Sequence, residues 1–198
     1  MDVPGLLKTA ALLIPAETVT QNGITVTDIR DSLDHREWEV ALDLLEELGD
    51  VHPLPLSFWQ GLATAAERMR LDWHAAWCHW RAYETRYGTI RADLTLTPAD
   101  STAYRRTPIP GAGVLRPAWD IGHRTTTGEP ELCTARLWVE YAPSLEPGGR
   151  ASVRLAPLSP SKWQLLQPGR AVTMHEDRTI TGTAVVVEVL PPPALESA

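Results

Sequence analysis

The chain has 198 residues, of which 43% are hydrophobic and 22% are charged. This composition excludes wholesale disorder, and the length is enough for one large or two small domains with their own cores. The apolar stretch within residues 6–14 is too short to cross a bilayer and is not flanked like a signal peptide, so no membrane association is expected. Two cysteines exclude a disulfide framework and favour the reducing cytoplasm.

The first 26 residues predict an N-terminal arm that is either mobile or carries a short helix over residues 5–13. Breaks within the arm are expected at Pro15, Asn22 and Gly23, residues that interrupt regular structure. The helical part of the protein is therefore expected to begin at residue 27.

Apolar residues recur with helical spacing through residues 27–88, and this pattern predicts a module of three amphipathic helices. Ser57 is followed three residues later by Gln60, which predicts a capping box at the start of the second helix. The expected bounds are Thr27 to Gly49, Ser57 to Met69 and Asp72 to Gly88. The third helix is expected to bury a mostly aromatic stripe of Trp73, Ala76, Trp77, Trp80, Tyr83 and Tyr87.

Most of the net charge of −7 comes from one acidic stretch, residues 28–50, in which nine acids face only two arginines. Such a surface repels phosphate backbones, so nucleic-acid binding through this part of the chain is disfavoured. Two interpretations remain: a solvated helix face that aids solubility, or a docking surface for a protein with a basic surface. The candidate partner-binding residues are Asp43, Glu46, Glu47 and Asp50.

After Gly88 the hydrophobic period changes from 3.6 to 2, and short alternating segments are separated by glycine and proline turns. This pattern predicts a closed or nearly closed antiparallel β-barrel over residues 89–191, followed by a disordered tail over residues 192–198. The predicted fold class is thus α+β, with a small helical module preceding the barrel. The expected strands are 90–96, 118–121, 132–141, 151–155, 171–175 and 180–190.

Several short motifs of the second half occur in a particular order. They are Arg91 to Leu96, Thr107 to Ile109, Arg116 and Pro117, Trp119, Leu166 to Val172, and Arg178, Thr179, Ile180, Gly182, Val185, Val186, Glu188, Val189 and Leu190. In this order and spacing, residues 90–190 resemble the third, C-terminal β-barrel domain of elongation factor Tu. The resemblance implies a barrel that contacts other macromolecules, including the backbone of tRNA.

The same resemblance supplies candidate RNA-binding residues, namely Arg178, Thr179 and Arg116. Asp177 departs from the glycine that is usual in this family and adds a negative charge beside Arg178. The GTPase domain of the family has no counterpart here, because the chain contains neither a Gly-x-x-x-x-Gly-Lys-Ser/Thr loop nor an Asn-Lys-x-Asp run.

No catalytic constellation is recognisable in the sequence. His74 and Cys78 lie four residues apart and share a helix face, but two ligands do not make a metal site, so a buried thiol beside a surface imidazole is the preferred interpretation. The serines occur without a Gly-x-Ser-x-Gly elbow. We therefore expect no enzyme activity, no cofactor, no metal and no small-molecule substrate.

These observations favour a non-catalytic cytoplasmic binding protein. The first hypothesis is an adaptor or an immunity-like antagonist that docks on a basic protein, such as a toxin domain or a translation component. The alternative hypothesis is a translation accessory that binds tRNA through the barrel.

Overall fold

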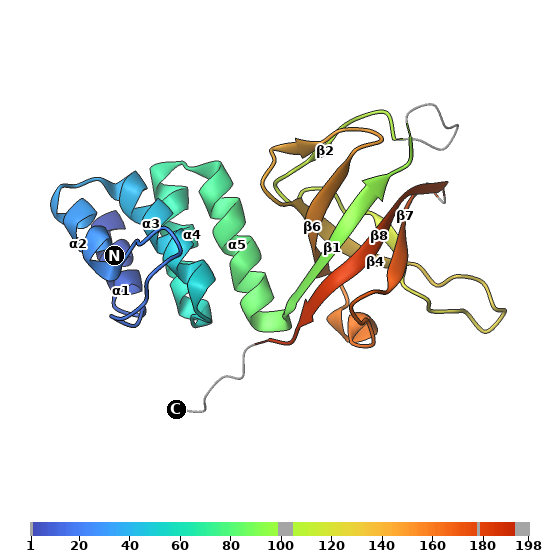
Figure 1. Cartoon of the computed structure of the whole chain (residues 1–198), viewed down its shortest axis with the longest axis horizontal. Helices are drawn as coiled ribbons and strands as arrows, with labels where there is room; N and C mark the ends of the chain where they lie inside the picture. Colours follow the sequence, from blue (N-terminus) through green and yellow to red (C-terminus); the bar gives the residue numbers. More distant parts are fainter. Residues whose placement is uncertain (1, 99–104, 178, 193–198) are drawn as a thin grey trace. The chain divides into compact units, whose positions relative to one another are not determined.

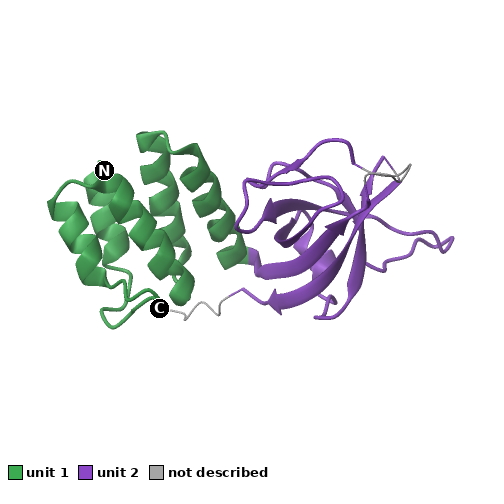
Figure 2. Cartoon of the chain, turned by 45° about the horizontal axis from the view of Figure 1, so that its top comes forward, with its two compact units in different colours: residues 1–86, 193–198 green, residues 87–192 purple. Residues whose placement is uncertain are grey.

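The computed structural model describes residues 2–98, 105–177 and 179–192. The chain separates into two compact units, a helical unit within Met1–Arg86 and a barrel unit of Tyr87–Pro192, which are coloured differently in Figure 2. The predicted α+β class is confirmed, because α-helices are followed by a closed antiparallel barrel. The predicted tail lies outside the described residues, except for Pro192.

The helical unit contains five described helices where the sequence predicts three. They are α1 (Val3–Ala11), α2 (Val26–Asp34), α3 (Trp38–Val51), α4 (Leu56–Met69) and α5 (Asp72–Tyr87), which can be followed in Figure 1. None of these helices has both the length and the apolar character that crossing a membrane would require.

Helix α1 belongs to the core of the helical unit, whereas the sequence sets residues 1–26 apart as an arm. Its Leu7 and Ala10 are buried, and the helix packs against α3 and α4. Asp2 caps the helix by accepting a hydrogen bond from the backbone N–H of Gly5. The apolar side chains in this stretch thus cover the core formed by the later helices.

The single helix predicted from Thr27 to Gly49 is in fact two helices, α2 and α3. Helix α2 starts at Val26, one residue earlier than predicted, after a capping box in which the Thr25 hydroxyl accepts from Thr27 N–H and Asp28 accepts from Thr25 N–H at 2.7 Å. It ends before Arg36, which adopts a left-handed φ of 64°. An α-helix cannot continue through that conformation, so the chain turns there and restarts as α3.

Helix α4 begins after Pro55 at Leu56 and has no side-chain cap, so the predicted Ser57 capping box is absent. Phe58 and Trp59 are both fully buried and meet edge to face, with ring centroids 5.0 Å apart. Gly49 on α3 faces these rings, and a β-carbon added there would lie 2.7 Å from the Trp59 ring. A side chain at position 49 would therefore overlap the rings on α4.

Helix α5 does not bury all of its predicted aromatic stripe. Ala75 and Cys78 are the buried residues of α5 that belong to the helical core, whereas 46% of Trp73 is exposed. The aromatic residues follow a helical period, but the buried side chains of α5 in the core of this unit are the small ones of Ala75 and Cys78. Trp80 of the predicted stripe is fully buried, so periodicity identified the helix but only part of its buried face.

The barrel has six strands in the closed order β1-β6-β4-β3-β7-β8, and all of their pairings are antiparallel. The strands are β1 (Thr89–Leu96), β3 (Ala118–Asp120), β4 (Cys133–Val139), β6 (Arg150–Pro157), β7 (Ala171–Glu176) and β8 (Thr179–Leu190). A separate two-stranded sheet pairs β2 (Ile109–Pro110) with β5 (Ser144–Leu145), and a 3₁₀ turn, η1, spans Pro160–Trp163.

Alternation along each strand fills the barrel with apolar side chains, as the sequence predicts. Leu94, Trp119 and Met174 are fully buried members of one hydrophobic cluster. The first and last strands close the barrel, with Thr89 opposite Leu190. Gly88 precedes this closure at a φ of 92°, and a β-carbon there would lie 2.4 Å from the Leu190 carbonyl oxygen. Glycine is needed at position 88 for both reasons.

On the outside of the barrel, Asp93 of β1 is held by β6. Arg150 donates to its Oδ2 at 2.9 Å and Ser152 donates to its Oδ1 at 3.0 Å, and these bonds lower the pKa of Asp93. A lowered carboxyl pKa stabilises the fold above the ordinary pKa of aspartate, and this contribution is lost as the pH falls through the folded-state pKa.

We expect Asp93→Asn to lower the free energy of unfolding at neutral pH by less than about 1 kcal/mol, because the Arg150 pair is open to solvent. The difference in the free energy of unfolding between wild type and variant should narrow below about pH 4, where the carboxyl protonates in the unfolded chain and then in the folded one. Urea unfolding of both proteins at a series of pH values measures this difference. Glu129→Gln, at an exposed residue, should show no such dependence. A gap that is constant with pH would contradict the prediction.

Candidate functional site

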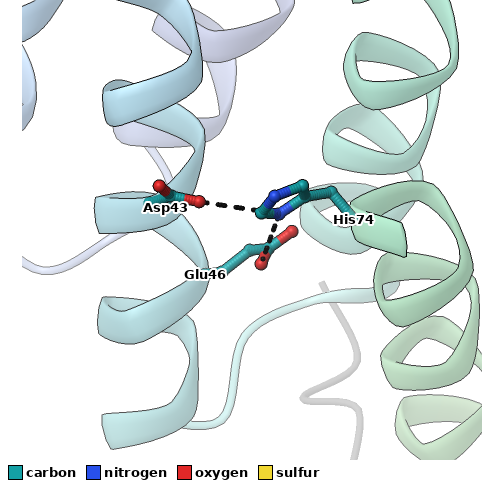
Figure 3. A group of neighbouring side chains, drawn as sticks. All are labelled: Asp43, Glu46 and His74. Atoms are coloured by element: carbon teal, nitrogen blue, oxygen red, sulfur yellow. Dashed lines mark hydrogen bonds and ion pairs between the residues drawn. The ribbon is translucent and has the colours of Figure 1, made fainter. Parts of the chain in front are cut away.

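A group of three titratable side chains in the helical unit lies between α3 and α5. Asp43 and Glu46, one turn apart on α3, point toward His74 on α5, as Figure 3 shows. The Nδ1 atom of His74 lies 3.2 Å from Oε2 of Glu46 and 3.6 Å from Oδ1 of Asp43. One ligand atom from each residue lies within 4.8 Å of the other two. We call these three residues the α3–α5 cluster.

The α3–α5 cluster runs from solvent into the helical unit. The Asp43 side chain is 57% exposed, whereas the side chains of His74 and Glu46 are only 23% and 14% exposed. Burial raises the pKa of both carboxyls, and for each of them the nearby His74 opposes this shift. The cluster is thus half sheltered, with one open side at Asp43.

Cys78 extends this arrangement into the core. Its thiol donates to Oε1 of Glu46 at 3.2 Å, and the residue is completely buried. Burial raises the pKa of Cys78 strongly, and the negative charge of Glu46 raises it further. The thiol is therefore protonated at neutral pH, which is the unreactive form of cysteine.

The four acids predicted to bind a partner all contact residues of their own unit. Asp43 and Glu46 belong to the α3–α5 cluster. Glu47 accepts a hydrogen bond from the Asn22 side chain at 2.8 Å, and Asp50 forms an ion pair with Arg81. Each of the four carboxylates is thus at least partly satisfied within the helical unit.

Another set of acids lies around the turn between α2 and α3. They are exposed, and within the described ranges of the chain their side chains form no hydrogen bond or ion pair. These residues are Asp31, Asp34, Glu37 and Glu39. We call them the α2–α3 acidic surface. The sequence reveals their charge; in the structure Asp31 and Asp34 lie near the end of α2, and Glu37 and Glu39 lie at the start of α3, on either side of Arg36.

Of the candidate RNA-binding residues, Arg178 lies outside the described residues. Arg116 is exposed, and Thr179 is exposed at the start of β8. Many other cations of the barrel are already paired with acids of the barrel. These pairs are Arg91 with Glu140 and Glu188, Arg105 with Glu176, Arg124 with Asp120, Arg150 with Asp93, Arg154 with Glu140, and Lys162 with Glu131. Such neutralised pairs are poorly suited to attract phosphate.

The barrel also has a pocket of about 400 Å³ between the end of β3 and the segment that follows η1. Its basic side chains are His123, Lys162 and Arg170. Lys162 is paired with Glu131, and the Nε2 of His123 donates to the Lys162 carbonyl oxygen at 2.7 Å. Because two of the three basic side chains are engaged, the pocket is a weaker candidate than the α3–α5 cluster.

Neither of two sequence comparisons related this chain to a known protein. A scan against protein-family models found no match to this chain. A search of curated proteins found no significant match either.

Proposed function

We propose that the protein is a non-catalytic cytoplasmic binding protein, an adaptor or an antagonist, whose helical unit docks on a protein with a basic surface. The observation that carries the proposal is the α2–α3 acidic surface, in which four exposed carboxylates form no ion pair with a cation of the described chain. Uncompensated charge of one sign lowers the stability of a fold slightly, and it also steers oppositely charged partners. The proposal does not rest on Asp43, Glu46, Glu47 and Asp50, because these acids contact other residues of the helical unit.

The resemblance of residues 90–190 to the third domain of elongation factor Tu supports a role for the barrel as a second binding surface. A tRNA-binding function would draw on the same resemblance and on Arg116 and Thr179. The ion-paired cations of the barrel give that alternative less support than the acidic surface gives to protein binding.

Reversing the charge of the acidic surface is expected to abolish binding of the partner protein. The variant Asp31→Lys, Asp34→Lys, Glu39→Lys should release proteins that co-purify with the wild-type chain, and these proteins should be basic. Raising the salt from about 0.05 M to about 0.5 M should release the same proteins, because exposed charges are screened. Quantitative mass spectrometry of pull-downs compares the samples.

A matched control carries the same change of net charge at exposed acids outside the α2–α3 acidic surface, namely Glu17→Lys, Glu129→Lys and Glu146→Lys. It should retain the partners. If both variants retain every partner, the acidic surface does not bind protein. If tRNA instead migrates more slowly in a gel at low salt when the wild-type chain is added, this result supports the RNA-binding alternative.

A further inference from the structure

The α3–α5 cluster combines imidazole and carboxylate donors from two helices, and its chemistry is independent of the α2–α3 acidic surface. We propose that Asp43, Glu46 and His74 form a binding site for a divalent transition-metal ion of the zinc class. Sequence reasoning set aside His74 and Cys78 because two ligands are too few. The structure brings two carboxylates of α3 to the same imidazole, and zinc sites with three protein ligands and one water are common.

The distances in the cluster fit a tetrahedral ion. Zinc bonds to nitrogen and oxygen of about 2.0 to 2.2 Å place two ligand atoms about 3.3 to 3.6 Å apart. The two measured distances from His74 Nδ1, 3.2 Å to Glu46 and 3.6 Å to Asp43, lie close to that edge length. The third edge, between the carboxylates, is at most 4.8 Å, and Asp43 is exposed enough to rotate and close it.

Charge supports the same arrangement. Asp43 and Glu46 are one turn apart on α3 and direct two negative charges at one imidazole. A protonated imidazole supplies only one positive charge, whereas a divalent ion supplies two. Because Glu46 is mostly desolvated, the gain from neutralising its carboxylate exceeds that of a surface carboxylate.

Cys78 acts as a positioning residue for Glu46. Its thiol donates to Oε1, which leaves Oε2 directed at the imidazole. Carboxylates that bind metals are commonly held in this way by a hydrogen bond to the oxygen that is not bound. The ligands are thus one nitrogen and two oxygens. Magnesium and calcium prefer six or more oxygens, whereas imidazole with carboxylate suits zinc, cobalt and nickel.

Isothermal titration calorimetry of the full chain, first stripped with a chelator, tests the proposal with Zn²⁺ as the probe. We expect one equivalent of Zn²⁺ to bind and Mg²⁺ not to compete. His74→Gln and Glu46→Gln should each weaken binding by at least about a hundredfold, the upper range seen for changes to outer-shell partners. His79→Gln is the matched control, because His79 lies on the same helix and contacts a single exposed acid, Glu67, at 2.8 Å. It should bind Zn²⁺ as the wild type does.

Two further measurements keep the test decisive if a variant folds poorly. Cobalt bound to the wild-type chain should show visible absorption without a thiolate-to-cobalt charge-transfer band, because Cys78 is not a ligand. Cys78→Ser, which keeps a donor to Glu46, should retain affinity within about tenfold. The proposal is overturned if the wild type binds no Zn²⁺, if His74→Gln and Glu46→Gln still bind it normally, or if a thiolate band appears.

Discussion

Replacing Trp59 by alanine is expected to lower the free energy of unfolding of the helical unit by about 3 to 5 kcal/mol, the cost typical of removing a buried tryptophan. The Trp59 ring is almost completely buried, packs edge to face on Phe58 and carries the Arg81 guanidinium 4.6 Å from its centroid. Alanine would leave a cavity beside Phe58 and Arg81. Urea unfolding followed by far-ultraviolet circular dichroism measures the loss, because the helices dominate that signal.

Gly49 provides an internal check on this explanation. Alanine normally stabilises a helix interior relative to glycine by up to about 1 kcal/mol. At position 49 its β-carbon would lie within 2.9 Å of the rings of both Trp59 and Phe58, so Gly49→Ala should instead destabilise. In the Trp59→Ala background much of that overlap disappears, and Gly49→Ala should cost less or become favourable. Additive effects of the two changes would show that the ring and the glycine are not coupled.

The second large effect is expected in the barrel, where Trp119→Ala should cost about 3 to 5 kcal/mol. Trp119 is fully buried on β3, opposite Cys133 of β4 and Met174 of β7, so its ring fills the space between three strands. Tryptophan fluorescence is ambiguous with eight tryptophans in the chain. Hydrogen exchange of the amides of β4 and β7 reports on the barrel directly, and their protection should fall.

Trp119→Phe separates packing from hydrogen bonding at this position. The Nε1 of Trp119 is buried and has no hydrogen-bond partner within the described parts of the chain. Phenylalanine removes this unsatisfied donor as well as part of the ring, and the first change offsets some of the cost of the second. We expect Trp119→Phe to cost clearly less than Trp119→Ala. Equal losses would mean that the ring volume does not govern the stability of this site.

The barrel was more predictable than the helices because its strands are recognised from a period of two. Leu94 and Val172 are buried as alternation requires, and glycine and proline mark the turns. In the helical unit, neighbouring residues offered alternative helix starts. Thr25 and Thr27 can each cap a helix, but only Thr25 has an acid, Asp28, three residues later, as a capping box requires. The break at Arg36 follows from a left-handed backbone that its residue type does not favour.

The candidate site was only partly predictable, since it joins residues that are far apart in the sequence. His74 and Cys78 share a helix face by spacing alone, and Asp43 and Glu46 share another. That the two faces meet depends on how α3 and α5 pack, which no local pattern contains. The same packing determines that Glu46 turns inward, while the acids near Arg36 remain in solvent.

The pairing of β1 with β8 sets the order in which the protein can fold as it is synthesised. Helices α1 to α5 all lie before Gly88, so the helical unit can fold before the barrel strands have been synthesised. The barrel can close only later, because β1 pairs with β8, with Thr89 opposite Leu190, and β8 is the last strand to be synthesised. During that interval the edges of β1 and β7 lie open, and the nascent chain is most exposed to wrong strand pairing at that stage.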